Sequence, residues 1–281
     1  HLGITIEHLR NSISIGGFEI AYYGIIIGCG MLAGIYMAQR DARRRGQNPE
    51  IYLDFALYAI IFSIIGARLY YVIFNWDLYK NDPIQIFNLR GGGLAIYGGI
   101  IGAVLTLIVF SRIKKTSFFS MADSGCIGLV TGQIIGRWGN FFNCEAFGGY
   151  TDNLFAMRIK MSLVNPSMIS QGLLEHRIVE NGVEYIQVHP TFLYESLWNV
   201  GVLIFLLWYR KRKRFDGEVL WVYLLGYGLG RAWIEGLRTD QLLFIGTGIP
   251  VSQALSMILV AASAAVIIWK RLRLKTGIKG E

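Results

Sequence analysis

Seven long apolar stretches constrain this chain more than any other feature of its sequence. They cover residues 18–38, 52–74, 92–110, 119–135, 190–208, 218–237 and 245–269. A helix that crosses a membrane needs roughly 20 mostly apolar residues, and these stretches reach or approach that length. The chain is also 53% hydrophobic and only 16% charged, which is too apolar for a soluble domain of 281 residues. The sequence therefore predicts an all-α membrane protein with about seven transmembrane helices.

Basic residues in the short connections predict the orientation of these helices. Lysine and arginine gather after the first, third, fifth and seventh stretches, at residues 40–45, 112–115, 210–214 and 270–275. Loops rich in these residues stay on the cytoplasmic side of a membrane. We therefore expect the C-terminus in the cytoplasm and the N-terminus outside. We expect no cleavable signal peptide.

The net charge of +8 does not indicate a nucleic-acid-binding protein. The positive residues lie in short clusters between apolar stretches, and no nucleic-acid motif accompanies them. The three cysteines, Cys29, Cys126 and Cys144, lack the spacing of a metal or redox site. The chain also lacks the motifs of nucleotide-binding, zinc-hydrolase and serine-hydrolase sites. We therefore expect neither a metal nor an organic cofactor.

A small extracytoplasmic head is expected at residues 150–188, between the fourth and fifth stretches. Within it, Asn181 and Gly182 join two β-prone runs, which is a strong hairpin signal. The rest of residues 1–281 is expected to form a single polytopic membrane domain. Residues 75–89 lie on the same side, and their Trp76 and Tyr79 suit the level of the lipid headgroups.

Many glycines recur every fourth residue, including the pairs 30 and 34, 98 and 102, and 128 and 132. Small residues at this spacing let helices approach closely in lipid, so packing is the first interpretation. The segment from Gly91 to Gly99 allows a second one. Its clustered glycines, Gly98 and Gly99 included, would expose backbone groups to a ligand headgroup at a membrane boundary. Packing and ligand binding both stay open there.

The segment from Gly136 to Gly148 carries polar side chains directly after an apolar stretch. These are Arg137, Asn140, Asn143 and Glu145. An ionisable residue at membrane depth is costly and by default indicates a functional site. Arg137 stays protonated when buried, so it needs an anion, either phosphate or a carboxylate such as Glu145. An internal ion pair that only joins the fourth helix to the head is the structural alternative.

Two further groups of polar residues lie near the predicted external side. Arg231, Glu235 and Arg238 are spaced i, i+4 and i+7, which places them on one helical face. For Arg238 alone, snorkelling to the interface is the favoured interpretation. Arg68 lies near the end of the second stretch, where it either snorkels or binds phosphate.

The chain re-enters the membrane near His189 and Glu195, which we interpret as structural residues beside a helix start. Several arginines near the outer leaflet, with few acids to neutralise them, predict an anionic ligand such as a phospholipid headgroup. A transporter or translocase for an anionic lipid or phosphorylated solute is the alternative function. Such folds are commonly built from two repeated halves, and this sequence contains no internal repeat.

The polar segment also carries a resemblance to a known family. Gly136-Arg-Trp-Gly-Asn-Phe-Phe-Asn-Cys-Glu-Ala-Phe-Gly148 resembles the signature of the prolipoprotein diacylglyceryl transferases, which are multi-pass enzymes of the bacterial cytoplasmic (inner) membrane. Other segments agree in order along nearly the whole chain: Tyr22-Tyr23-Gly24, Gly66-Ala-Arg68, Gly91 to Gly99, His189-Pro-Thr, Leu193-Tyr-Glu195, and Arg231 with Glu235 and Arg238. Residues 150–188 match no motif of the family.

The resemblance implies a reaction and its partners. Phosphatidylglycerol donates its diacylglyceryl group to the lipobox cysteine that follows the signal peptide of a prolipoprotein, which forms a thioether and releases glycerol phosphate. Arg137 and Arg231 are then expected to hold the phosphate, with Glu145 and Tyr97 completing the catalytic set. Substrate contacts are expected from Tyr23, Arg68, Gly98, Gly99, Asn140, Asn143, Gly148, Glu235 and Arg238. Among these acids and amides, Asn140, Glu145 and Glu235 are expected to orient the guanidinium groups.

Tyr97 is a departure from the family pattern. Some members have histidine at this place, and that histidine is a proposed base. A tyrosine has an ordinary pKa of about 10 and a thiol one of about 8.5, so a neutral tyrosine is a poor base near pH 7. Tyr97 assisted by arginines, Glu145 as proton acceptor, and a positive site that lowers the pKa of the substrate thiol are the three alternatives. We favour the last.

Overall fold

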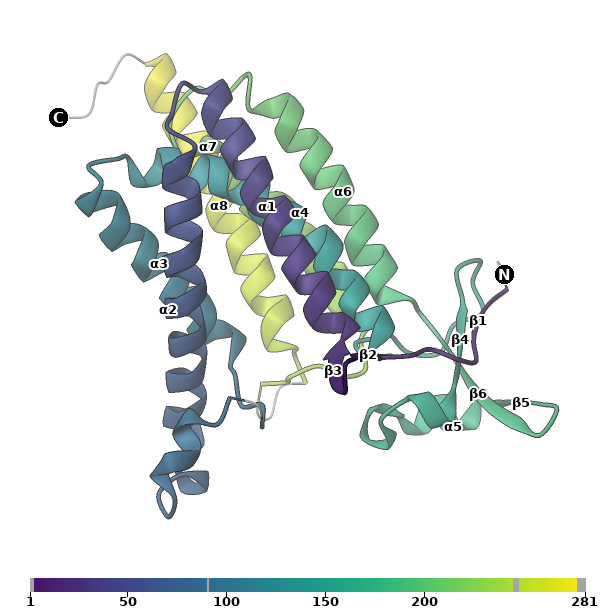
Figure 1. The fold of residues 1–281 in the computed structure, drawn as a ribbon. Coiled ribbons are helices and arrows are strands. Elements are labelled where there is room, and N and C mark those ends of the chain that lie inside the picture. Colours follow the sequence, from purple (N-terminus) through teal and green to yellow (C-terminus); the bar gives the residue numbers. More distant parts are fainter. Residues whose placement is uncertain (1–2, 90, 245–247, 277–281) are drawn as a thin grey trace. The chain divides into compact units, whose positions relative to one another are not determined.

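The computed structural model describes residues 3–89, 91–244 and 248–276 (Figure 1). The chain divides into two compact units, one built from residues 1–34 and 126–281 and the other from residues 35–125. Two long helices connect them. Helix α1, Tyr22–Arg44, begins in the first unit and ends in the second, and helix α4, Phe118–Phe142, runs from the second unit into the first.

Six of the described helices are long and apolar enough to cross a membrane. They are α1, α4, α2 (Glu50–Phe74), α3 (Ile96–Ile113), α6 (Thr191–Tyr209) and α8 (Val251–Lys275). Helix α7, Glu218–Glu235, coincides with the remaining predicted stretch and has 18 residues, but Glu218, Arg231 and Glu235 give it three charges. The mostly helical membrane class is therefore confirmed, and the count of seven spans stays a prediction.

Several helix boundaries differ from those predicted, including the following three. Phe18–Ala21, predicted as the start of the first span, is strand β3, because Gly16 and Gly17 turn the chain back onto strand β2, Ser12–Ile15. Helix α4 continues past residue 135 to Phe142, so part of the polar segment is helical. The predicted start of the last span, Ile245, lies outside the described residues, and helix α8 begins at Val251.

Glycines allow close helix packing in the first unit. A side chain at Gly34 on α1 would place its Cβ 2.7 Å from the Gly128 carbonyl oxygen on α4, and one at Gly30 would lie 3.1 Å from the Gly132 carbonyl oxygen. Lipid offers little hydrophobic drive for helix association, so such direct backbone contact matters for stability. The packing interpretation is confirmed for these two pairs. It does not explain Gly24 and Gly28, which have nothing within 4 Å of a Cβ.

A four-stranded sheet of order β1-β4-β6-β5 forms the head. Strands β4 (Met157–Lys160), β5 (Ile178–Glu180) and β6 (Val183–Val188) come from the predicted segment, as does the short helix α5 (Gln171–Glu175). Asn181 and Gly182, with φ of 52° and 78°, make the β5–β6 turn, which confirms the hairpin. Strand β1, Ile4–Ile6, was not predicted and pairs parallel with β4. Strand β6 leads into α6 (Figure 1), which places the sheet beside the first turn of that helix.

The second unit is centred on the pair α2 and α3. A Cβ at Gly66 would lie 2.5 Å from the Gly98 carbonyl oxygen, and Gly98 and Gly102 in turn leave no room for a side chain against α2. Two short 3-10 turns, Trp76–Leu78 and Pro83–Phe87, connect the helices. Glycine packing therefore accounts for the close contact of the two helices.

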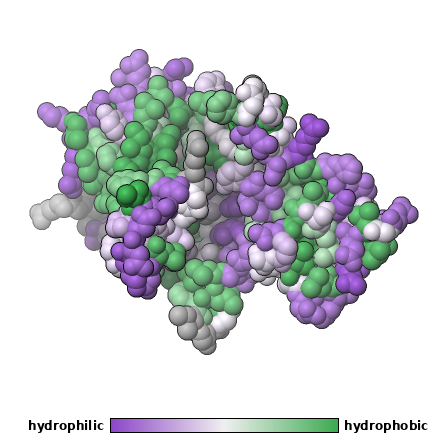
Figure 2. All heavy atoms as spheres, turned by 60° about the horizontal axis from the view of Figure 1, so that its bottom comes forward, coloured by the Kyte–Doolittle hydropathy of each residue, from purple (hydrophilic) through white to green (hydrophobic). Residues whose placement is uncertain are grey.

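Large apolar side chains stand on the surface of the helices. Leu32, Ile73, Ile113 and Ile258 are between 64% and 71% exposed, and hydrophobic residues cover wide areas of the view in Figure 2. Large contiguous patches of apolar surface are rare on soluble monomers, and many exposed apolar side chains on long helices suit a lipid environment. This surface fits helices whose outer faces are in contact with lipid.

Candidate active site

The polar segment begins on the last turns of α4. This helix carries Arg137 and Asn140, and it ends at Phe142. We predicted that the helix ends before these residues, because an isolated charge is costly in lipid. The helix instead continues through Arg137. The charge of Arg137 is not isolated, because it faces a carboxylate from another helix.

That carboxylate belongs to Glu195 on the first turns of α6. Its Oε2 lies 2.6 Å from Nη2 of Arg137, and its Oε1 accepts a hydrogen bond of 3.0 Å from Nη1 of Arg231 on α7. Arg238 lies farther away, with 4.0 Å between Nη1 and the same Oε1. Glu195 thus joins three arginines from two separate stretches of sequence. The sequence interpretation of Glu195 as a helix-start residue missed this role, although the residue belongs to a quoted family segment.

The cluster formed by Arg137, Glu195, Arg231, Glu235 and Arg238 has a buried negative side and a more exposed positive side. The side chains of Glu195 and Glu235 are 5% and 3% exposed, whereas those of Arg137 and Arg231 are 21% and 15% exposed. A ligand that approaches from the solvent or headgroup side therefore meets guanidinium groups first. Arginine forks of this kind suit phosphate oxygens.

Each arginine of the cluster also has a carboxylate of its own or a share of one. Arg231 lies 2.5 Å from Glu235, and Arg238 donates two hydrogen bonds to Asp240, of 2.9 and 2.7 Å. Burial on its own would raise the pKa of Asp240, but the hydrogen bonds and positive charge of Arg238, together with a backbone hydrogen bond and the charge of Arg231, lower that pKa. The expectation of arginines with few neutralising acids is therefore wrong for this cluster. Glu195 and Glu235 are the buried acids among these partners, whereas the side chain of Asp240 is 31% exposed.

Glu145 does not contact Arg137 directly. Its Oε1 accepts hydrogen bonds from the side-chain amides of Asn140, at 2.9 Å, and Asn143, at 3.3 Å. Asn140 in turn places its Oδ1 3.5 Å from Nη1 of Arg137, a marginal hydrogen bond. The sequence predicted either phosphate or a carboxylate such as Glu145 as the anion beside Arg137. The structure instead links Glu145 to Arg137 through Asn140, because Glu195 occupies the position beside the guanidinium.

Backbone hydrogen bonds hold the three polar segments together. The Gly148 amide donates to the His189 carbonyl at 3.0 Å, and the Gly149 amide donates to the Leu237 carbonyl at 2.9 Å. A Cβ at Gly148 would lie 2.7 Å from the Leu237 carbonyl oxygen, so the close approach requires glycine. Gly148 is thereby explained as a packing residue between the chain before α6 and the chain after α7.

Two residues beside the cluster differ in accessibility. The Tyr23 ring packs over Gly139 of α4, where a Cβ would lie 2.8 Å from the ring, and Tyr23 is 37% exposed. Cys144 is buried with Phe147 in the core under the sheet. Burial raises the pKa of the Cys144 thiol, which disfavours the reactive thiolate.

Arg68, in the second unit, uses its guanidinium on the backbone. It donates to five carbonyl oxygens at 2.5 to 3.1 Å, those of Gln85, Ile86, Asn88, Gly92 and Gly93. A guanidinium has five N–H donors, so this set engages all of them. Arg68 is 6% exposed. Arg68 therefore does not snorkel but anchors the glycine-rich loop, and its predicted contact with the substrate stays a prediction.

Tyr97, Gly98 and Gly99 lie on the first turn of α3, also in the second unit. Gly98 is buried against Gly66 and Tyr70 of α2. Tyr97 and Gly99 are half-buried. Gly98 thus packs against α2, and the predicted roles of Tyr97, Gly98 and Gly99 in catalysis and binding stay predictions.

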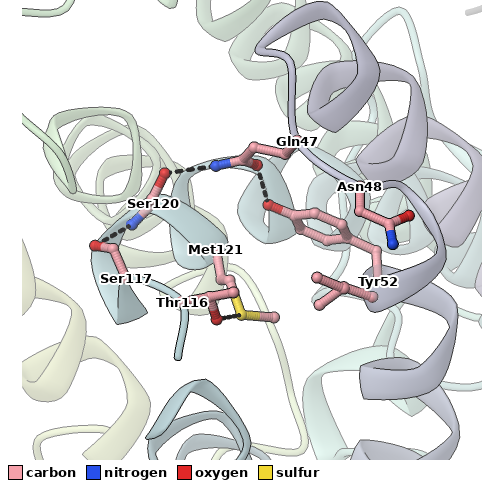
Figure 3. A pocket seen from close by; sticks show the side chains of 8 residues that line it. Gln47, Asn48, Tyr52, Thr116, Ser117, Ser120 and Met121 are labelled. Carbon is pink, nitrogen blue, oxygen red and sulfur yellow. Dashed lines mark hydrogen bonds between the residues drawn. The ribbon is translucent and has the colours of Figure 1, made fainter. Parts of the chain in front are cut away.

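The second unit also contains a cavity of about 240 Å³ that no sequence signal indicated (Figure 3). It is lined by Gln47, Asn48, Ile51, Tyr52, Thr116, Ser117, Ser120 and Met121. The Tyr52 hydroxyl donates to Gln47 at 2.6 Å, and the Gln47 amide donates to the Ser120 hydroxyl at 2.7 Å. None of the predicted site residues lines this cavity, so it is not the predicted phosphate site.

Comparison with known proteins relates the chain to one family over most of its length. The sequence profile described as prolipoprotein diacylglyceryl transferase matches residues 10–269. A phosphatidylglycerol–prolipoprotein diacylglyceryl transferase of Bacillus cytotoxicus is 42% identical over 278 residues, which cover 98% of this chain and 96% of that protein. The protein of the same name from Listeria monocytogenes is 43% identical over 265 residues, or 94% and 90% of the two chains. The one from Clostridioides difficile is 42% identical over 234 residues, or 83% and 85%.

These matches include Arg137, Glu195 and Arg231 within one continuous family assignment. They extend over both compact units and the head. The alternative of an anion transporter is not favoured by any of them. Nearly full-length similarity at this identity shows that the chain belongs to the prolipoprotein diacylglyceryl transferase family.

Proposed function

We propose that this protein transfers the diacylglyceryl group of phosphatidylglycerol to the lipobox cysteine of a prolipoprotein. The observation that carries the proposal is the contact of buried Glu195 with Arg137 and Arg231, which leaves the guanidinium groups on the exposed side of the cluster. The names of the relatives supply the donor and the acceptor class.

In this reaction the cysteine sulfur attacks the diacylglyceryl carbon that carries the phosphate ester. A C–S bond forms, the C–O bond to phosphate breaks, and its electron pair leaves with glycerol phosphate. Negative charge therefore grows on the phosphate in the transition state. Arg137 and Arg231 supply donors where that charge develops, and such preorganised donors are worth orders of magnitude in rate.

The remaining site residues take supporting roles in this proposal. Asn140, Asn143 and Glu145 form a chain that limits the movement of Arg137, and Glu235 holds Arg231. Arg238 reinforces the positive side, and Tyr23 contacts lipid or acceptor. Tyr97 and Gly99, on the first turn of α3, are proposed as a catalytic residue and a substrate-contacting residue, respectively.

The proton of the acceptor thiol needs no dedicated histidine in this scheme. A positive site stabilises the thiolate and lowers the pKa of the substrate thiol. Tyr97 or Glu145 then acts only as a relay to water. No metal or organic cofactor takes part, because phosphate leaves readily once its charge is held.

We further propose a seven-span topology with the N-terminus outside and the C-terminus in the cytoplasm of a bacterial inner membrane. Helix α7 counts as a span because its charges have partners. Glu218 is fully buried and lies 2.5 Å from Arg271 of α8, while Arg231 and Glu235 belong to the cluster. The head at residues 150–188 and the cluster then lie on the extracytoplasmic side, where lipid and signal peptide enter laterally.

A reconstituted assay tests the function directly. Purified protein in phosphatidylglycerol vesicles is given a lipobox peptide, and released glycerol phosphate and peptide mass are measured. We expect release only with the cysteine peptide, not with its serine variant. Movement of lipid or anion across the vesicle without release would mean a transporter and would reject the proposal.

A further inference from the structure

A small cavity lies between α6 and α7 next to the arginine–carboxylate cluster. Its volume is about 10 Å³, and it is lined by Glu195, Trp198, Asn199, Tyr227, Gly230, Arg231 and Ile234. A cavity of that size is close to the minimum that holds one water molecule. Four of its lining side chains are polar or charged, which suits a water rather than an empty apolar void.

Asn199 is one of two polar residues of this cavity, beside Tyr227, that neither the sequence analysis nor the proposed mechanism uses. It is 2% exposed, and within the described part of the chain its side-chain nitrogen Nδ2 has no hydrogen-bond acceptor. A buried amide that gives up its hydrogen bond to water is costly unless a partner replaces it. The cavity beside Asn199 is where such a partner fits.

The positions along the helices connect Asn199 to the cluster. Asn199 lies one turn after Glu195 on α6, and Tyr227 lies one turn before Arg231 on α7, so both pairs share a helical face. Gly230 faces the Trp198 ring too closely for any side chain, which brings the two helices together around the cavity. The Trp198 indole is fixed by a 2.8 Å hydrogen bond to the Gly226 carbonyl.

We propose that Asn199 is a positioning residue of the cluster, acting through a single water bound in this cavity. The water accepts from the Asn199 amide and donates toward the Glu195 carboxylate. Each Glu195 oxygen already faces an arginine, at 2.6 Å from Arg137 and 3.0 Å from Arg231. A carboxylate has room for about four hydrogen bonds, so the water adds a further restraint from the buried side. The restraint keeps Glu195 aligned under the arginines.

The proposal rests on the proposed transferase function and is tested with Asn199→Leu and Asn199→Ser. Leucine keeps the volume and removes every hydrogen bond, whereas serine leaves a donor and space for water. We expect Asn199→Leu to lower kcat about tenfold with a smaller change in KM for phosphatidylglycerol, and Asn199→Ser to keep at least half of kcat. Ser263→Ala is the matched control, because Ser263 on α8 is also fully buried with a hydroxyl that has no described partner. It should leave kcat unchanged.

Two results would overturn the proposal. One is an unchanged kcat in Asn199→Leu. It would mean that the Asn199 amide is simply unpaired, and replacing an unpaired amide by leucine leaves the melting temperature unchanged or raises it. The other is an equal loss of kcat in the leucine and serine variants, which would mean a packing role.

An activity-independent measurement separates this proposal from the transferase assignment. In protein labelled with 15N at asparagine side chains, the Asn199 amide signal is identified by its absence in Asn199→Leu. It should show a magnetisation-transfer peak to bound water. If the wild-type Asn199 signal lacks this transfer peak, the proposed water site is rejected even when the enzyme is active. If the peak is present but the wild-type protein shows no diacylglyceryl transfer, only the proposed transferase function is rejected and the water site stands.

Discussion

Glu195 meets Arg137 with one carboxylate oxygen, at 2.6 Å, and Arg231 with the other, at 3.0 Å. One buried acid thus sets the separation of two arginines that come from α4 and α7. Because the two guanidinium groups are more exposed than the carboxylate between them, we propose that the pair forms an anion site whose counter-charge is buried. The following predictions examine the parts of this arrangement.

Replacing Arg137 by alanine should lower kcat/KM for diacylglyceryl transfer at least about a hundredfold, because the donor that faces the leaving phosphate is lost. Arg137→Lys should also be severely impaired, since lysine cannot make a planar two-donor contact. Arg158→Ala is the control. Arg158 has a similar exposure of 22% and a similar ion pair of 2.6 Å with Glu180, but it lies in the head. Peptide mass spectrometry measures transfer, and normal turnover of Arg137→Ala would contradict the assignment.

Glu195→Gln should lower both stability and activity. The substitution keeps the shape and removes the charge, so two arginines lose their shared buried partner, at a cost of roughly 3 kcal/mol. Denaturant unfolding in detergent micelles and the transfer assay measure the two effects. Glu180→Gln removes the exposed acid of a head ion pair and should change neither by much, because such pairs contribute about 0 to 1 kcal/mol. A fully stable Glu195→Gln would argue that Glu195 is dispensable for the cluster.

Arg68→Ala should release the loop that follows α2 rather than a bound phosphate. Five backbone carbonyls lose their donor, so amide exchange in residues 85–89 and 91–93 should accelerate markedly. Arg68→Lys should not restore protection, because lysine offers only three donors from a single point. Hydrogen exchange by mass spectrometry measures the loop. Wild-type exchange with weakened inhibition by glycerol phosphate would instead make Arg68 a ligand of the phosphate.

His189 should make the protein lose stability as the pH falls. Burial lowers the pKa of His189 below its ordinary value of 6.5. Below about pH 6.5 the His189 imidazole is protonated in the unfolded chain but stays neutral in the folded chain. The free energy of unfolding is therefore highest above about pH 6.5 and declines as the pH falls below it. Melting temperatures between pH 8 and pH 5 should fall less in His189→Gln than in the wild type. His176→Gln, at an exposed histidine, should follow the wild-type curve. Identical slopes in all three proteins would show that His189 titrates normally.

Local patterns in the sequence predicted much of the fold. Apolar stretches identified all seven long helices that the structure contains within its described residues, although α7 does not qualify as a span by composition. The Asn181-Gly182 pair predicted the β5–β6 hairpin, because a tight turn is a property of adjacent residues. Strand β1 was missed because its partner β4 lies about 150 residues away, and its own three residues carry no turn signal.

The sequence by itself determined which residues are chemically unusual, because a charge within an apolar run is visible without any structure. It therefore identified Arg137, Arg231 and Glu145. Only the tertiary structure decided how they pair. Glu195 rather than Glu145 contacts Arg137, and backbone carbonyls rather than an anion engage Arg68. An ion pair depends on distances between helices that are far apart in the chain, and no local pattern of residues contains those distances.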